Sequence, residues 1–159
     1  MSPNGMPKKV RIAPSLLSAD FTRLKDEIAM IEAGGADWLH VDVMDGVFVP
    51  NLTFGAKMIE SCRKLTALPL DVHLMVVEPE KYFDSFAKAG ATGLTIHVEA
   101  APHLQRQIVR VRERGCAGGV ADCVYLVIGI SVAESSACPV RLSPSHMRPG
   151  LVDEYQHRS

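Results

Sequence analysis

The chain has 159 residues, with 17 Lys and Arg against 18 Asp and Glu, so its formal net charge is −1. Hydrophobic residues make up 47% and charged residues 22%, which is typical of one folded domain and argues against intrinsic disorder over most of the chain. The balanced charge argues against binding to nucleic acid or to an anionic membrane surface, and the longest apolar run, at 124–130, is far shorter than the roughly 20 residues of a membrane-spanning helix.

Cysteine spacing and the N-terminal segment indicate the compartment. The four cysteines form no CxxC pair or other metal-binding spacing, so we expect reduced thiols. The first residues, MSPNGMPKK, contain no apolar core of a secretion signal. Together these features predict a cytoplasmic protein.

Short apolar runs alternate with helix-period stretches along the first two-thirds of the chain. Phe21, Leu24, Ile28 and Ile31, for example, are spaced by three or four residues, which predicts one apolar helical stripe. The predicted strands lie at 10–14, 38–43, 69–75 and 94–98, and the predicted helices at 20–33, 56–64, 78–88 and 102–114. Alternating strands and helices at this spacing predict an α/β fold with a parallel sheet.

The character of the sequence changes after Gly118. A fifth strand is predicted at 124–130, but no helix-period pattern follows it, and residues 131–150 contain five Ser, three Pro and one Gly. We therefore expect residues 1–118 to form the folded unit and 119–159 to form a divergent tail of one strand followed by loop or disorder.

Two of the predicted strands carry histidine and aspartate in alternation. The second reads HVDVM from His40 and the third reads DVHLM from Asp71. Because neighbouring side chains on a strand point to opposite faces, His40, Asp42 and His73 should share the face away from the helices. Two imidazoles and a carboxylate from adjacent strands suit a divalent transition metal such as Zn, Fe, Mn or Co, and a hydrogen-bonded polar core cluster is the alternative.

Other candidate residues have weaker patterns. Ser15 follows the first predicted strand, where its hydroxyl either meets a substrate or simply caps a turn. His97 and Glu99 share a face at the end of the fourth strand, where they support the site or line its mouth, although Glu99 fits a surface loop equally well. Met44 and Met75 either cover a substrate pocket or fill the core.

These residues stand in a specific order of motifs. The segments APSLLSADF at 13–21, DWLHVDVMDGVFVPNLTFG at 37–55, LDVHLMV at 70–76 and TIHVEA at 95–100 resemble ribulose-phosphate 3-epimerases over roughly residues 10–116. The resemblance implies a TIM barrel that interconverts D-ribulose 5-phosphate and D-xylulose 5-phosphate in the pentose phosphate pathway. This chain has about four and a half of the eight βα units, so the expected fold is a partial barrel of the ribulose-phosphate-binding type, followed by an irregular tail.

The resemblance also implies roles for individual residues. His40, Asp42 and His73 would be metal ligands, with Asp42 also the acid/base group at the substrate's C3. The substrate-binding residues would be Ser15, His40, Met44, His73 and Met75, with both methionines capping the enediolate intermediate. The expected ligand is a small-molecule sugar phosphate.

The C-terminal part departs from the family pattern. Nothing after Gly118 resembles the strand that carries the family's second aspartate, or its glycine-rich phosphate loops. We therefore expect impaired epimerase activity. The alternatives are a hexulose-phosphate 3-epimerase, an inactive truncated isoform, and a partner-binding half-barrel whose open sheet edge docks on another chain. Exposed sheet edges also allow a homo-oligomer.

Overall fold

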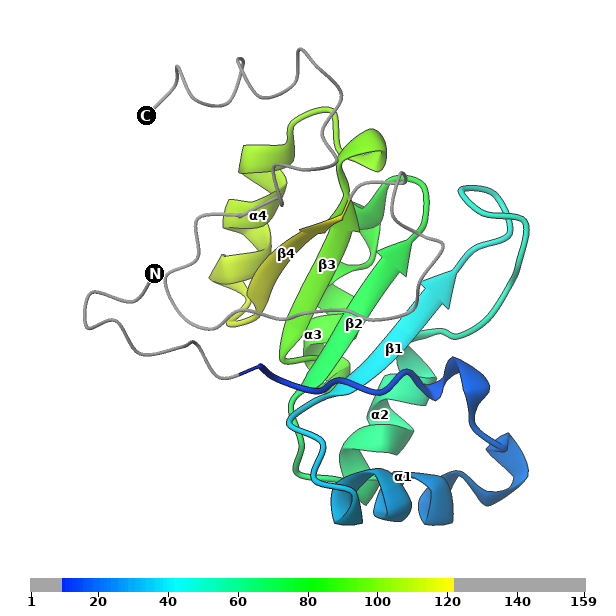
Figure 1. Ribbon diagram of the computed structural model, residues 1–159. Coiled ribbons are helices and arrows are strands. Elements are labelled where there is room, and N and C mark those ends of the chain that lie inside the picture. Colours follow the sequence, from blue (N-terminus) through cyan, green and yellow to red (C-terminus); the bar gives the residue numbers. More distant parts are fainter. Residues whose placement is uncertain (1–9, 122–159) are drawn as a thin grey trace, which may run out of the picture.

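The structure, a computed structural model, describes residues 10–121, and these residues form an α/β unit built on one parallel sheet (Figure 1). The strands follow the order β1-β2-β3-β4, and every neighbouring pair is parallel. The strands are β1 Leu39–Met44, β2 Leu70–Met75, β3 Gly93–His97 and β4 Ala117–Ala121, and the α-helices are α1 Leu24–Ala33, α2 Ala56–Leu65, α3 Phe83–Ala89 and α4 Leu104–Glu113. Strand and helix alternate as predicted, in agreement with part of a TIM-barrel-type fold.

The helices and the alternation of the strands place the apolar core on one face of the sheet. In Figure 1, α2 and α3 lie behind the sheet. The strand residues that pack toward them, Val41, Val43, Val72 and Leu74, are all buried in one core cluster with Ile59, Phe83 and Phe86. The predicted division of each strand into an apolar and a polar face is therefore confirmed. The polar face is left for the His and Asp side chains.

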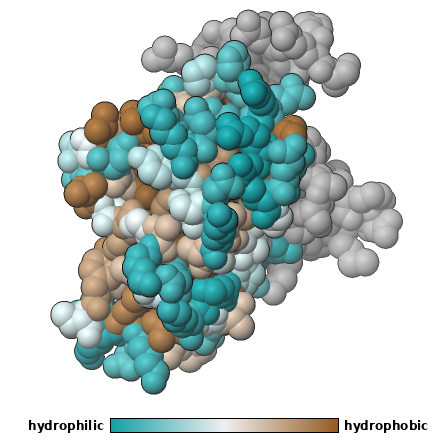
Figure 2. All heavy atoms as spheres, turned by 180° about the vertical axis from the view of Figure 1, so that it is seen from behind, coloured by the Kyte–Doolittle hydropathy of each residue, from teal (hydrophilic) through white to brown (hydrophobic). Residues whose placement is uncertain are grey.

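The opposite side of the helical layer carries mostly hydrophilic side chains. Figure 2, seen from behind the sheet, shows hydrophilic residues over much of this face, with hydrophobic residues in smaller patches at its edge and between them. This is the amphipathic arrangement expected of helices that cover a sheet. In the described part of the chain, no helix is both long enough and apolar enough to span a membrane.

The prediction of a strand at 10–14 is wrong, because this segment does not form a regular strand. This segment lies beside β1, where Ile12 O accepts from the N–H groups of Asp37 and Trp38 and Pro14 O accepts from His40 N–H. Its ladder, however, is a single parallel bridge between Ser15 and His40. Pro14 has no N–H to donate, and Val10 and Ile12 are 71% and 58% exposed, so neither hydrogen bonds nor burial stabilise a longer strand.

The structure contains a strand that the sequence did not indicate. β4 pairs with β3 from Gly93↔Ala117 to His97↔Ala121, so the sheet crosses the boundary expected after residue 118. Its sequence, AGGVA, has low strand propensity because glycine brings no side chain to pack. The strand predicted at 124–130 and the tail beyond it lie outside the described residues.

Helix limits differ from the predicted ones mainly at their N-terminal ends. The helix predicted at 20–33 begins as a 3₁₀ turn at Phe21–Arg23 before α1, and the helix predicted at 78–88 begins as a 3₁₀ turn at Pro79–Lys81 before α3. Gly90 ends α3 as predicted, with φ of 104°. A Cβ at Gly90 would lie 2.8 Å from the Arg63 side chain, so this turn needs glycine for both its backbone and its packing.

Candidate metal centre

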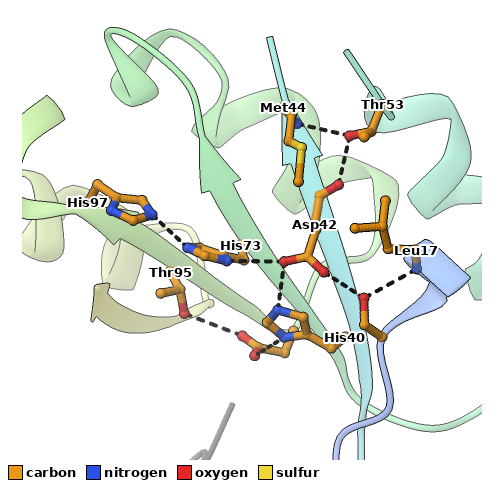
Figure 3. Close-up of polar contacts among 10 residues, drawn as sticks. Leu17, His40, Asp42, Met44, Thr53, His73, Thr95 and His97 are labelled. Atoms are coloured by element: carbon orange, nitrogen blue, oxygen red, sulfur yellow. Dashed lines mark hydrogen bonds and ion pairs between the residues drawn. The ribbon is translucent and has the colours of Figure 1, made fainter. Parts of the chain in front are cut away.

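Strand register brings the histidines and aspartates of β1 and β2 together. Parallel pairing aligns His40 with Asp71 and Asp42 with His73. Figure 3 shows His40, Asp42 and His73 converging on one face of the sheet, with Asp42 between the two imidazoles. One ligand atom from each of His40, Asp42 and His73 can be chosen so that all lie within 4.8 Å of one another. The structure thus brings together the three residues that the sequence singled out as metal ligands.

Asp42 contacts three other side chains of this cluster. Its Oδ1 lies 3.1 Å from His40 Nε2 and 3.1 Å from His73 Nδ1. Its Oδ2 accepts a 2.5 Å hydrogen bond from the Ser15 hydroxyl, which also accepts from Leu17 N–H and so caps the turn at Leu16–Ser18. The prediction that Ser15 caps a turn is therefore confirmed. Its hydroxyl also reaches the polar cluster, and its contact with a substrate stays a prediction.

The far nitrogen of each imidazole is also engaged. His40 Nδ1 lies 2.8 Å from Asp71 Oδ2, and His73 Nε2 lies 2.8 Å from His97 Nε2. Asp71 in turn accepts a weak, 3.4 Å hydrogen bond from Thr95 Oγ1. Each ring is held through one nitrogen, which leaves Nε2 of His40 and Nδ1 of His73 directed at Asp42. Metal-binding histidines in proteins are commonly held in this way by a second group.

Burial and charge act in opposite directions on these groups. Burial lowers the pKa of His40, but hydrogen bonds with Asp42 and Asp71 and their negative charges outweigh it and raise the pKa to about 9. Burial likewise raises the pKa of Asp42, yet hydrogen bonds with His40, His73 and Ser15 hold it far below the usual value for an aspartate. Both shifts favour an ion pair between a protonated His40 imidazole and the ionised Asp42 carboxylate.

The loop after β1 is tied back to the cluster. Thr53 Oγ1 donates to Asp42 O at 2.7 Å and accepts from Met44 N–H at 2.9 Å. Asp45 anchors the same loop, because its carboxylate accepts from the N–H groups of Val47, Phe48 and Val77, each at 2.8 Å. These bonds hold the end of β1, and with it Asp42, in a defined position.

The two methionines lie at the same level of the sheet. Met44 and Met75 are register partners at the ends of β1 and β2, and they are 9% and 1% exposed. They follow His40 and Asp42, and Asp71 and His73, on the polar face, and they lie outside the apolar core cluster of the described residues. Their place beside the polar cluster fits the predicted role as a cover over a substrate, which stays a prediction.

The donor set fits a divalent transition metal. Two imidazole nitrogens and a carboxylate oxygen are the ligand types that such ions take in proteins. The centre is 9–13% exposed at His40, His73 and Asp42, so an ion there would be largely shielded from solvent. His40 Nε2 and His73 Nδ1 are the nitrogens placed to bind it.

The sequence analysis did not identify Asp71 and His97 as the partners of the two histidine ligands. Asp71 shares its strand face with His73, and the matched HVDVM and DVHLM segments would have placed it opposite His40 if the strands had been aligned by their first residues. His97 was expected to support the site or line its mouth. It is fully buried and contacts His73, so it supports the site. Glu99 lies at the edge, with its Oε2 3.5 Å from His97 Nδ1.

Comparison with known proteins identifies the family of the chain. Residues 11–124 match the ribulose-phosphate 3 epimerase family. The chain belongs to this family. The ribulose-phosphate 3-epimerase of Synechocystis sp. is 55% identical over 116 residues, covering 72% of this chain and 50% of that protein. The enzyme of the same name from Bacillus subtilis is 55% identical over 111 residues, covering 70% of this chain and 51% of that protein.

The chain spans about half the length of the curated relatives it matches. The match covers β1 to β4 and therefore includes His40, Asp42 and His73. The resemblance seen in the sequence motifs is thus confirmed for the N-terminal two-thirds of the chain.

Proposed function

We propose that this chain performs metal-assisted proton transfer at C3 of a sugar phosphate, as part of the ribulose-phosphate 3-epimerase reaction that interconverts D-ribulose 5-phosphate and D-xylulose 5-phosphate. The observation that carries the proposal is the convergence of two imidazoles on the Asp42 carboxylate, at distances of 3.1 Å each. Family membership supports the choice of reaction, since relatives that are 55% identical over the matched residues are named ribulose-phosphate 3-epimerase.

The proposed ligands of the ion are His40, Asp42 and His73. Zinc, iron, manganese and cobalt all accept this set of donors. When bound, the ion would act as a Lewis acid that stabilises negative charge on the substrate oxygens beside C3. His40 must give up its Nε2 proton to bind, because only the neutral imidazole offers a lone pair.

Asp42 is the proposed acid/base group. Its lowered pKa means that the carboxylate is ionised at neutral pH, as a group that accepts a proton from the carbon beside a carbonyl must be. The Ser15 hydroxyl, which donates to Oδ2 at 2.5 Å, orients the carboxylate and binds substrate. Met44 and Met75 are proposed to exclude water from the same side of the substrate.

Inversion at C3 requires a second group that protonates the opposite face. The sequence after Gly118 has no counterpart of the family's second aspartate or of its phosphate-binding loops. A site with one acid/base group tends to return the proton to the face from which it came. Without phosphate anchoring, less binding energy is available to hold C3 over Asp42. We therefore propose that the chain exchanges the C3 hydrogen with solvent faster than it inverts the carbon.

Proton exchange in deuterated water, measured beside a coupled epimerase assay, tests this proposal. With ribulose 5-phosphate and added zinc or manganese, we expect deuterium to appear at C3 with little xylulose 5-phosphate, and Asp42→Asn to stop the exchange. Asp84→Asn is the matched control, since Asp84 is exposed and pairs with Arg114. Rapid formation of xylulose 5-phosphate that Asp42→Asn abolishes would contradict the one-sided mechanism. Exchange that persists in Asp42→Asn would contradict the role of Asp42.

The compartment and the oligomeric state stay predictions. A relative from rice carries the words "cytoplasmic isoform" in its name, and one from Arabidopsis thaliana is named as chloroplastic. Imaging of a tagged full chain tests the cytoplasmic location. Size-exclusion chromatography with light scattering tests association through the sheet edges.

A further inference from the structure

We propose that His97 is a positioning residue of the metal centre: by accepting the Nε2 proton of His73, it leaves Nδ1 of His73 free to bind the ion. The inference rests on the proposed function, since it takes His40, Asp42 and His73 as the ligands.

The position of His97 is tightly constrained. It is the last residue of β3, its side chain is fully buried, and its Nε2 lies 2.8 Å from Nε2 of His73. The two rings lie nearly parallel, with their centroids 4.9 Å apart, and Phe48 contacts His97 with its ring centroid also at 4.9 Å. Figure 3 shows His97, His73 and Asp42 in a row that crosses from β3 to β1. A ring held in this way cannot turn freely to exchange its nitrogens.

A hydrogen bond between two imidazoles requires one N–H donor and one bare nitrogen. With one proton on each ring, only two arrangements satisfy the 2.8 Å contact. In the first, His97 Nε2–H donates to His73, and His73 Nδ1–H donates to Asp42 Oδ1. In the second, His73 Nε2–H donates to His97, and His97 Nδ1–H points toward Glu99 Oε2 at 3.5 Å.

Only the second arrangement is compatible with metal binding. A ligand nitrogen must offer its lone pair, so Nδ1 of His73 cannot carry a proton. The ring of His73 must then carry its proton on Nε2, and the neighbouring nitrogen of His97 must accept it. The negative charge of Glu99 favours the same arrangement, because it attracts the proton of His97 to Nδ1.

The change between the arrangements is balanced in protons. Nδ1 of His73 loses one proton to water, one proton passes from His97 Nε2 to His73 Nε2, and Nδ1 of His97 takes one from water. Neither ring changes its charge. Asp71 acts on His40 from the other side of the centre, since its carboxylate holds a proton on Nδ1 and leaves Nε2 for the ion. Both histidine ligands are thus held by a neighbour in the form that binds metal.

Zinc titration calorimetry of the full chain, compared between wild type and two His97 variants, tests the inference. His97→Phe keeps a ring against Phe48 but offers no acceptor, and we expect zinc affinity to fall about 10–100-fold, as when a supporting group of a metal ligand is removed. His97→Gln offers an amide oxygen to the Nε2 proton, so it should keep most of the wild-type affinity. His103→Phe makes the same replacement at an exposed histidine and should bind zinc as wild type does.

Nitrogen NMR of the histidine rings in the wild-type chain gives a readout that needs no variant. We expect saturation with zinc to place the His97 proton on Nδ1 and the His73 proton on Nε2. A zinc-loaded protein with the His97 proton on Nε2, or equal zinc affinity in wild type and His97→Phe, would overturn the inference while leaving the metal centre intact. Failure of the wild type to bind zinc, manganese or cobalt would overturn the metal centre itself and the role of His97 with it.

Discussion

Replacing Asp71 by asparagine should weaken zinc binding, and the loss should grow as the pH rises. Asp71 Oδ2 lies 2.8 Å from His40 Nδ1, and the two side chains are 8% and 9% exposed. An ionised carboxylate at this distance holds the ring in place and makes its other nitrogen a better ligand. The neutral amide of asparagine is a weaker acceptor and does neither as well.

Two effects of opposite sign determine the size of the loss. Removal of a carboxylate that orients a metal-binding histidine costs about 10–100-fold in affinity, or roughly 1.4–2.7 kcal/mol. The same carboxylate, however, acts together with Asp42 to raise the pKa of His40 to about 9, so at pH 7 the proton on His40 weakens metal binding by about 100-fold in the wild type. Asp71→Asn relieves part of this competition. The loss of zinc affinity in Asp71→Asn should therefore be small at pH 7 and approach its full size at pH 9.

Zinc titrations against a competing chelator at pH 7 and pH 9 measure this difference. Asp84→Asn makes the same change on the surface, where Asp84 pairs with Arg114 at 2.8 Å, and should leave zinc affinity unchanged at both pH values. Circular dichroism of each variant checks that the fold is retained. A ratio of wild-type to Asp71→Asn affinity that does not change with pH, or equal affinities at pH 9, would refute the reasoning.

Two further predictions concern the stability of the scaffold. Phe83→Ala should lower the free energy of unfolding by about 3–5 kcal/mol, because Phe83 is fully buried in the core. Leu52→Ala should change the free energy of unfolding little, because Leu52 is 80% exposed. Urea denaturation of both variants measures the difference. Burial raises the pKa of Asp45, but the three backbone N–H groups that it accepts from outweigh this and lower it. The stability that Asp45 contributes is therefore present above its unfolded pKa of about 3.9 and is lost as the pH falls through its native pKa. Acid titration of stability should show a smaller loss below pH 4 in Asp45→Asn than in wild type, and parallel curves for the two proteins would contradict this.

Local sequence patterns determined the βα alternation and the two faces of the central strands. Val41, Val43, Val72 and Leu74 are apolar at every second position, and the strand period of two leaves the intervening His and Asp residues no choice but the opposite face. Helix periods located α1, α2, α3 and α4 to within a few residues. Where local propensity was weak, as in the glycine-rich β4, the pattern indicated no strand. Where proline and exposure broke the ladder, as at 10–14, it predicted a strand that the structure does not have.

The contacts of the candidate metal centre were decided by tertiary structure. The sequence by itself determined that His40, Asp42 and His73 lie on the polar faces of their strands, because alternation is a local property of each strand. It did not determine the register that sets Asp71 against His40 and Asp42 against His73, because parallel strands are joined through a helix whose packing sets their offset. The 2.8 Å contact between His73 and His97 likewise depends on the pairing of β2 with β3, which brings together residues that are 24 positions apart in the chain.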